Sequence, residues 1–449
     1  MTAHKRQLVL NVFLTSHGHH PAGWRSPDAP DGGNPSFAHW ADMVRTAERG
    51  KLDAVFFADF VGSGGGRAQS EFRRPAGQAF EPLTIAGALA AITSRIGIVV
   101  TANTNFTEPY NLARQLASLD HLSDGRIGWN VVSSLSEGAI ASFGVTQPIE
   151  HADRYARADE FIDVARQLWD SWDDDAFDYP DKAAGIFARG DAAHTVRHRG
   201  RFFQIETQLD IARPIQGYPV FVQAGNSDTG REFAARNAEM IYASAQTLED
   251  AQAYYRDVKG RMAKYGRHPD DLKVTPGLSF SIGESEQEAQ EKFEALQESV
   301  SFSGPVELWG HDLSSYDLDG PLPDLPEPPN GKGRWQQLVT LARRENLSIR
   351  QLVLRFSVVR GHRVVIGTPA QIAEQIEDWF LNEGADGFNL IPPQQPQSLA
   401  QFVDLVVPEL QHRGIFREDY AGRTLREHLG LRRPENQHSQ TPATATAAE

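Results

Sequence analysis

The stretch from Pro109 to Ser134 constrains the fold of this chain more than any other. Pro109 suits the first position of a helix, where its missing N–H costs nothing, and leucines then recur at helical spacing. Gly125 follows as a turn residue that tolerates positive φ. Residues 127–132 form an apolar run that is too continuous for a half-exposed strand, and Ser133 follows them. Helix, tight turn, buried strand and polar tip together indicate one repeat of a parallel α/β sheet.

The same alternation of strand and helix recurs along the chain. The expected strands are 8–14, 53–57, 96–101, 127–132, 219–223, 240–243, 273–282 and 387–391. Strands that alternate with helices in this way predict an α/β fold, a (β/α)8 TIM barrel, rather than an open sheet. The length agrees with this prediction, because barrels with insertions reach 449 residues as one domain.

Two segments do not follow the alternation. Residues 301–358 are rich in Pro, Gly and Asp before they become helical, and they are too long for an ordinary loop. We interpret them as the largest insertion, placed before the last strand and acting as a lid or a subunit contact. Residues 434–449 are polar and alanine-rich, so we expect a disordered tail after a single domain of residues 1–433.

Charge and cysteine content exclude several classes of function. The net charge is −15, from 44 basic and 59 acidic residues, and we find no basic stripe for nucleic acid or an anionic membrane. The absence of cysteine excludes disulfides, thiolate metal ligands and a cysteine nucleophile. No run approaches 18 apolar residues, so we expect no membrane span and a cytoplasmic protein.

The ends of the expected strands carry amides, hydroxyls and histidines but few carboxylates. In a barrel these carboxyl ends form the catalytic face. The polar positions there are His17–His20, Asp59, 103–105, 130–134, 225–227 and Ser281. They include neither the facing carboxylates of a glycosidase nor a Ser-His-Asp order. The chemistry is therefore expected to come from a bound group.

The sequence QAGNSDTG at 223–230 is the best indication of what is bound. Small residues follow a strand, and Ser227 opens a helix. This arrangement places backbone N–H groups and a hydroxyl at the positive end of the helix dipole. This is the composition of a phosphate site. A plain helix N-cap at Ser227 explains the same residues equally well.

Four segments together resemble the flavin-dependent monooxygenases of the bacterial luciferase-like superfamily. They are AERGKLDAVFFAD (47–59), TEPYNLARQLASLDHLSDGRIGWNVVSS (107–134), HADRYARADEFI (151–162) and QAGNSDTG (223–230). Their order and spacing are similar to the branch that contains nitrilotriacetate, dibenzothiophene-sulfone and long-chain alkane monooxygenases. The resemblance implies a barrel that binds FMN.

The resemblance also implies which residues hold the cofactor. They are Asp59 and Thr104 near the flavin ring and ribityl chain, Asn130 and Ser134 along the same cleft, His151 and Tyr155 at the start of the next helix, and Ser227 at the phosphate. Each has a structural explanation as well: Asp59 as an acceptor for loop amides, Tyr155 as a packed ring, and His151 as a cap of its own helix. Their mutual consistency favours the flavin site. Asn103 stands where the branch commonly has serine, which leaves the flavin contact there open.

For the reaction, the resemblance implies a two-component system. A separate NAD(P)H:FMN reductase supplies reduced FMN (FMNH2), and O2 is used to oxygenate a small organic substrate. Histidine titrates near neutrality, which makes His17, His20 and His311 candidate proton donors or substrate contacts. Members of this family are usually dimers or tetramers, so we expect a homodimer or homotetramer.

Three other interpretations remain open. His17-Gly18-His19 mimics the HxH pair of a metal-dependent barrel hydrolase, but the later strand ends lack further ligands, so we expect no metal site. A deazaflavin-dependent oxidoreductase would use the same barrel. A flavin storage protein would bind the cofactor without turnover, although the long insertion argues against it.

Overall fold

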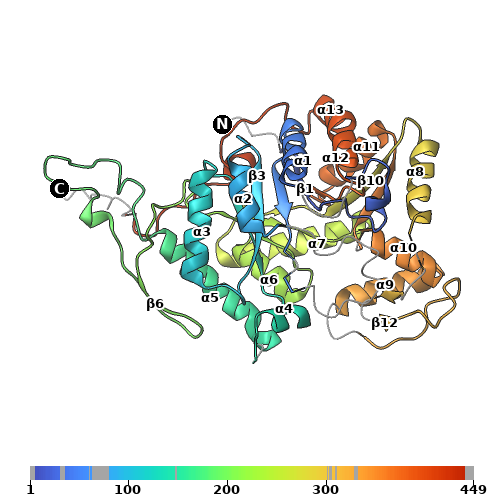
Figure 1. Cartoon of the computed structure of the whole chain (residues 1–449), viewed down its shortest axis with the longest axis horizontal. Coiled ribbons are helices and arrows are strands. Elements are labelled where there is room, and N and C mark those ends of the chain that lie inside the picture. The colour runs from blue at the N-terminus through green and yellow to red at the C-terminus, as the bar shows by residue number, and fades with distance from the viewer. Residues whose placement is uncertain are drawn as a thin grey trace, which may run out of the picture.

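The fold is described from a computed structural model of the chain. The structure describes residues 6–30, 36–59, 61–62, 80–146, 149–300, 302, 306–308, 311–327, 332–359 and 361–439. Within these residues a ring of parallel strands forms the centre of the molecule, and helices surround it (Figure 1).

The strands of the ring follow the chain in order. They are β1 (Val9–Phe13), β2 (Ala54–Phe57), β3 (Gly97–Asn103), β4 (Ile127–Val132), β7 (Val220–Gln223), β8 (Met240–Ile241), β9 (Lys273–Val274), β10 (Gly277–Ile282) and β14 (Gly387–Leu390). The ring closes because Asn389 of β14 pairs with Asn11 of β1 on one side and with Gly277 of β10 on the other. β9 and β10 are two parts of the predicted strand 273–282, of which β9 pairs with β8. The predicted TIM barrel is confirmed.

One strand of the sheet was not predicted. β13 (Arg363–Gly367) runs parallel to β10 and pairs with it from Leu278 to Ile282, whereas β14 pairs with β10 only at Gly277 and Leu278. The apolar run of β13 ends directly at Thr368, the N-cap of the next helix, so in the sequence it resembles only the approach to that helix.

The helices cover the outside of the barrel. The principal ones are α1 (Phe37–Arg49), α2 (Pro82–Ala90), α3 (Pro109–Leu122), α5 (His151–Trp169), α6 (Asp228–Asn237), α7 (Leu248–Gly260), α8 (Glu286–Glu298) and α11 (Pro369–Leu381). Shorter ones are α4 (Glu137–Ser142), α12 (Gln397–Gln401), α13 (Val407–His412) and α14 (Leu425–His428). Their apolar faces and the outward side chains of the strands form the main core, which contains the fully buried Trp129 and Trp169. No helix of the described chain is long and apolar enough to cross a membrane.

A second apolar cluster fills the barrel itself. Val9, Phe56 and Val222 belong to it, together with Leu425 of α14 and Leu429, the residue that caps the end of α14. A Cβ at Gly97 would lie 2.5 Å from Leu425 Cδ1, so the strand carries no side chain where this leucine inserts. The C-terminal segment therefore plugs the barrel.

The stretch that opened the sequence analysis folds as predicted. α3 begins at Pro109, and the turn after it places Asp124 and Gly125 at φ of 54° and 80°. β4 follows, with Trp129 fully buried and its indole N–H donating to Ala102 O at 3.2 Å. The strand then ends at the polar Ser133, as the sequence indicated.

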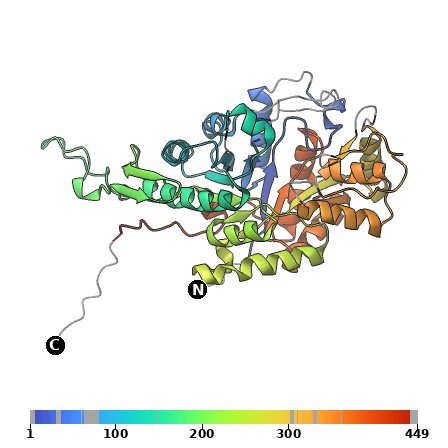
Figure 2. The same cartoon turned by 90° about the horizontal axis from the view of Figure 1, so that it is seen from below.

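The insertion folds around apolar residues of its own. It contains β11 (Glu307–Leu308), β12 (His311–Asp312), α9 (Lys332–Arg344) and α10 (Ile349–Val359). Leu313, Trp335 and Leu352 belong to a cluster separate from both barrel cores. Figure 2 shows the insertion in orange at one end of the molecule, opposite a green arm that includes the hairpin β5 (Val196–Arg199) and β6 (Gln204–Thr207).

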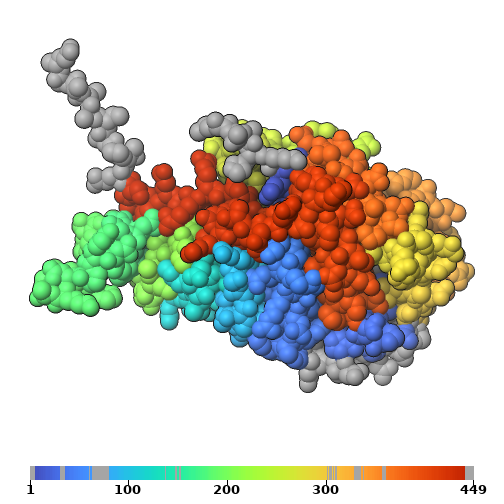
Figure 3. Space-filling model, turned by 90° about the horizontal axis from the view of Figure 1, so that it is seen from above, coloured from blue at the N-terminus to red at the C-terminus, as the bar shows by residue number. Residues whose placement is uncertain are grey.

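The end of the described chain corrects one prediction. Residues 434–439 were expected to be disordered, but Asn436 is buried and its side-chain amide donates to Trp172 O at 2.8 Å. The Arg213 guanidinium donates to Pro434 O at 3.0 Å. These are backbone contacts, which composition does not reveal. Residues 440–449 lie outside the described residues. In Figure 3 the red C-terminal segment runs alongside the blue and cyan N-terminal part of the barrel.

Candidate active site

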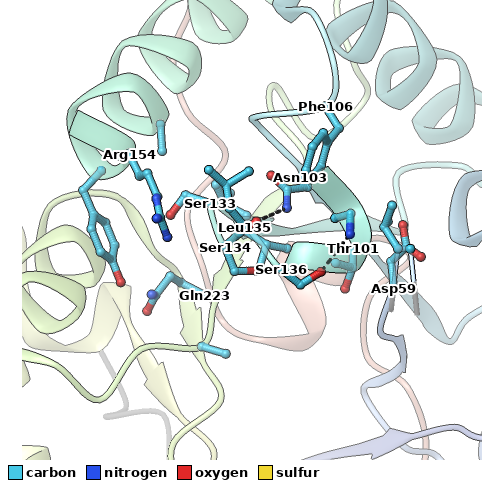
Figure 4. A pocket seen from close by; sticks show the side chains of 18 of the residues that line it. Asp59, Thr101, Asn103, Phe106, Ser133, Ser134, Leu135, Ser136, Arg154 and Gln223 are labelled. Atoms are coloured by element: carbon cyan, nitrogen blue, oxygen red, sulfur yellow. Dashed lines mark hydrogen bonds between the residues drawn. The ribbon is translucent and has the colours of Figure 1, made fainter. Parts of the chain in front are cut away.

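A cavity of about 700 Å³ opens at the carboxyl ends of β2, β3, β4 and β7 (Figure 4). This volume lies within the range of small-molecule sites, roughly 300–1,000 Å³. Its polar lining residues are Asp59, Thr101, Asn103, Ser133, Ser134, Ser136, Arg154, Tyr155 and Gln223. The cavity therefore lies on the face where a barrel carries its chemistry.

Asp59 is the acidic residue of the cavity wall, and it follows β2 by two residues. Burial raises the pKa of its carboxyl to about 6, and the negative charge of Glu81 adds to the rise. Near neutral pH this carboxyl is therefore close to its titration point.

The wall between β3 and β4 is held by amide side chains. Asn103 Nδ2 donates to Ser134 O at 2.7 Å, and Asn105 Nδ2 donates to Ser133 O at 2.8 Å. The position where the family commonly has serine is therefore used here to shape the turn after β4. Behind the wall, Asn130 Nδ2 donates to Thr101 Oγ1 at 2.9 Å.

Helix α5 supplies a cation and a phenol. Arg154 Nε donates to Ile149 O at 3.2 Å, and the other guanidinium nitrogens have no partner within the described part of the chain. The Tyr155 ring packs edge-on against Phe233 with 5.5 Å between centroids. Both residues line the cavity, so a guanidinium and a phenol lie side by side in sequence near the start of one helix.

The loop between β7 and α6 is built for close approach. Ser227 is the N-cap of α6, and its Oγ accepts from Gly230 N at 3.1 Å. A Cβ at Gly230 would lie 3.1 Å from both Ser227 Oγ and the Tyr155 hydroxyl, and one at Gly225 would lie 2.3 Å from Gln223 Nε2. The Tyr254 hydroxyl donates to Gly225 O at 3.1 Å and fixes the loop. The hydroxyls of Ser227 and Tyr155 thus both lie next to Gly230.

Two glycines close the opposite side of the cavity. Gly62 and Gly138 both line it, and Gly62 has a φ of 72°. A Cβ at Gly138 would lie 1.9 Å from Gly62 O. The loop after β2 and the start of α4 therefore touch backbone to backbone. Beside them the rings of Phe106 and Phe143 stack at 4.5 Å.

Comparison with known proteins identifies this arrangement. The family model described as luciferase-like monooxygenase matches residues 13–387. The chain belongs to the luciferase-like monooxygenase family. It is 47% identical over 444 residues to nitrilotriacetate monooxygenase component A of Aminobacter aminovorans, covering 96% of this chain and 98% of the relative. It is 42% identical to N-acetyl-S-(2-succino)cysteine monooxygenase of Bacillus subtilis (strain 168), covering 98% and 100%.

The solved structures agree. A riboflavin lyase crystallised with modified FMN and riboflavin superposes with a TM-score of 0.82 at 31% identity, covering 96% of this chain and 97% of the lyase. The resemblance found in the sequence is confirmed, and this luciferase-like protein is a flavin-dependent monooxygenase. The deazaflavin oxidoreductase and the metal-dependent hydrolase are not supported.

The structure of this monooxygenase brings only some of the predicted residues to the cavity. Asp59, Ser134 and Tyr155 line it. Thr104 is fully buried, and its hydroxyl donates to Val132 O at 3.3 Å, so it lies behind the wall. Asn130 also lies behind the wall, bonded to a lining residue. The side chain of His151, at the start of α5, lies outside the described residues.

The three candidate histidines lie elsewhere than in the lining of this cavity. His17 is bonded to the Ser16 hydroxyl at 2.9 Å. His20 lines a second cavity of about 390 Å³ beside α8, and burial lowers its pKa to about 4. His311 packs against Trp335 within the insertion, with 4.8 Å between ring centroids. The geometry therefore gives none of them a place at the luciferase-like cavity.

Arg154 and Gln223 are cavity residues that the sequence analysis did not single out. Arg154 directly precedes Tyr155 in a segment that was matched to the family, and Gln223 ends the strand before the predicted phosphate loop. Their positions were available, but nothing in the sequence distinguishes an arginine that faces a cavity from one that faces solvent.

The residues present fit FMN. A phosphate needs hydroxyl, amide and cationic donors, which Tyr155, the loop at Gly230 and Arg154 offer. Ribityl hydroxyls need acceptors, and the Oε1 atom of Gln223 is buried without a hydrogen-bond partner in the described structure. Polar, cationic and glycine-lined surfaces therefore occur where the cofactor requires them.

Proposed function

We propose that the cavity binds reduced FMN and that the enzyme oxygenates a small organic substrate with O2. The meeting of the Tyr155 and Ser227 hydroxyls at Gly230, with Arg154 beside them, carries this proposal. These groups bind the phosphate. Asp59, Ser134 and Gln223 line the rest of the cavity and hold the ribityl chain and the ring.

Reduced flavin, when bound, supplies the electrons with which oxygen is activated. The protein orients the cofactor and keeps water away from the reacting atoms. We assign this exclusion to Phe106, whose ring lines the cavity and stacks on the exposed ring of Phe143, and to the backbone contact between Gly62 and Gly138. The Asp59 carboxyl, which titrates near pH 6, holds or releases a proton at the cavity wall.

We propose further that a separate NAD(P)H:FMN reductase supplies the cofactor. The name of the nitrilotriacetate relative, component A, marks it as one part of a multi-component system. The substrates named for this relative and for the Bacillus enzyme are both organic acids with an amine nitrogen or a thioether sulfur. We assign the same substrate class to this chain, together with a homodimeric or homotetrameric assembly and work in the cytoplasm, where NAD(P)H is available.

The insertion is proposed as a lid. It has a core of its own and joins the barrel through β13, so it can move as a unit relative to the cavity. His311 belongs to it and would approach the site on closure. His17 and His20 keep their proposed roles as substrate contacts only if the substrate reaches the loop after β1.

Titration with reduced FMN tests the phosphate site. We expect Ser227→Ala combined with Tyr155→Phe to weaken binding by about 10- to 100-fold, because hydrogen bonds to a charged phosphate are lost. Ser227→Asp keeps an N-cap acceptor but should abolish binding of FMN through charge repulsion. Riboflavin, which lacks the phosphate, should bind all variants alike.

Ser285→Ala is the matched control. Ser285 caps α8 as Ser227 caps α6, accepting from Glu288 N at 3.2 Å, but it does not belong to the loop between β7 and α6, where Ser227 lies beside the lining residue Tyr155. Ser285→Ala should destabilise helix α8 but leave the affinity for reduced FMN unchanged. Equal FMN affinity in wild type and Ser227→Asp would refute the phosphate site.

A further inference from the structure

A second polar group lies at the barrel mouth beside the cavity. Tyr242 directly follows β8, and its N–H donates to the backbone oxygen of Gln223 at 2.9 Å. Gln223 lines the proposed flavin cavity. Tyr242 therefore stands on the strand next to that cavity, on the same catalytic face.

The ring of Tyr242 covers the apolar filling of the barrel. It packs against Phe13 of β1 and Phe56 of β2, with 5.9 Å between centroids in each case. Both phenylalanines belong to the interior cluster, and Tyr242 is half-buried on top of it. At the barrel mouth, the half-buried ring of Tyr242 thus covers the buried rings of Phe13 and Phe56.

His362 fixes the orientation of that phenol. The Tyr242 hydroxyl and His362 Nε2 share a hydrogen bond of 2.9 Å, and the two rings stack with 4.8 Å between centroids. His362 is 6% exposed, so the imidazole approaches the phenol from the interior of the protein. A stacked and hydrogen-bonded pair leaves the tyrosine little rotational freedom.

The insertion delivers His362 to this place. Gly361 and His362 connect α10 of the insertion to β13. Ser244 Oγ donates to Gly361 O at 3.0 Å, and a Cβ at Gly277 would lie 2.5 Å from His362 Nδ1. The absence of a side chain at Gly277 makes room for the imidazole. The insertion is therefore anchored to the barrel mouth at this histidine.

We propose that Tyr242 is a substrate-binding residue, which donates a hydrogen bond from its hydroxyl to a carboxylate of the substrate, and that His362 is its positioning residue. The proposal rests on the proposed function, because it takes the cavity beside β7 as the flavin site and places the substrate next to it. The partly exposed ring of Tyr242 contacts the carbon skeleton, and its hydroxyl fixes the acidic end of the substrate.

Steady-state turnover with a flavin reductase, NADH and FMN tests the pair, with nitrilotriacetate and N-acetyl-S-(2-succino)cysteine as probes. Tyr242→Phe keeps the ring that packs on Phe13 and Phe56 and removes only the hydroxyl. We expect its KM for both carboxylated probes to rise about tenfold or more, as for loss of a hydrogen bond to a charged group. The share of NADH that ends as hydrogen peroxide should rise, while reduced FMN affinity stays within about twofold.

The double variant separates positioning from packing. His362→Gln should raise KM in the same direction, and the Tyr242→Phe/His362→Gln double variant should be no worse than Tyr242→Phe alone. Additive effects would show that His362 acts independently of the tyrosine and would overturn its positioning role. Tyr420→Phe is the control. The Tyr420 hydroxyl donates to Leu52 O at 2.7 Å, and neither residue lines the cavity.

Two results overturn the assignment of Tyr242. One is an unchanged KM in Tyr242→Phe, and the other is turnover of neither probe by a wild-type enzyme that binds reduced FMN. Failure of the wild type to bind reduced FMN is a different result, which refutes the proposed function itself. Reduced FMN binding is therefore measured first on every variant.

Discussion

Asp59 shows how much the pKa of one half-buried carboxyl depends on its surroundings. Its pKa is raised to about 6 because burial disfavours the charged form and Glu81 adds a like charge. The folded protein therefore holds this proton more tightly than the unfolded chain does. Stability from this group is complete at low pH and is lost as pH rises from about 4 through about 6.

Asp59→Asn should therefore stabilise the protein above pH 6 and have little effect at pH 4. Full conversion of the shift gives about 3 kcal/mol, and solvent screening of this partly exposed group reduces the expected gain to about 1 kcal/mol. Urea unfolding from pH 4 to pH 8 measures it. A gain that is constant over this range would show that the carboxyl does not titrate there.

The sequence shows which residue stands at each position but not where its side chain points, so it predicted only some of the cavity residues. Asp59, Ser134 and Tyr155 were recognised because they stand at strand or helix ends within family segments, and they line the cavity. Thr104 also follows the end of a strand, but its hydroxyl donates to Val132 O. The direction of a side chain depends on neighbours that are distant in sequence, which a single chain does not display.

At the scale of elements, loops decide the shape of the cavity while strands hold it in place. The loop after β2 contacts the start of α4 through Gly62 and Gly138, where there is no room for a side chain. The strands were predictable because buried parallel strands are continuously apolar. β13 was missed because it lies beside the ring and merges with a helix start, and the loop contacts have no periodic signal at all.

Gly138→Ala should separate this loop from α4. A Cβ 1.9 Å from Gly62 O cannot be accommodated without a backbone shift. We therefore expect the affinity for reduced FMN to fall about tenfold, and the free energy of unfolding to fall by about 1–3 kcal/mol. Gly260→Ala is the control, because no described atom lies within 4 Å of a Cβ there. Flavin titration and thermal unfolding of both variants decide the matter. Full affinity in Gly138→Ala would show that the contact is not needed.

For the whole molecule, the C-terminal segment holds distant parts together. Leu425 fills the barrel, and the buried Arg417 forms an ion pair with Asp53, which is also buried. Further on, Asn436 hydrogen-bonds the turn after α5 through Trp172 O. Composition predicted a tail from residue 434, yet the polar residues there satisfy buried backbone groups.

Asn436→Ala should lower the free energy of unfolding by about 1–3 kcal/mol, since it leaves buried carbonyl groups without their donor. Glu435→Ala, at the exposed neighbouring position, should change it by less than about 0.5 kcal/mol. Chemical denaturation compares the two variants. Equal stabilities would mean that residues 434–439 do not contribute to folding.

The separate apolar cluster of the insertion has an evolutionary consequence. Because Leu313, Trp335 and Leu352 pack on one another and not on the barrel cores, mutations among them are absorbed locally. On the proposed function, selection can therefore remodel the insertion while the proposed flavin site on β7 and α5 is inherited unchanged. Exchange of this module between relatives is a direct route to enzymes with new substrate ranges.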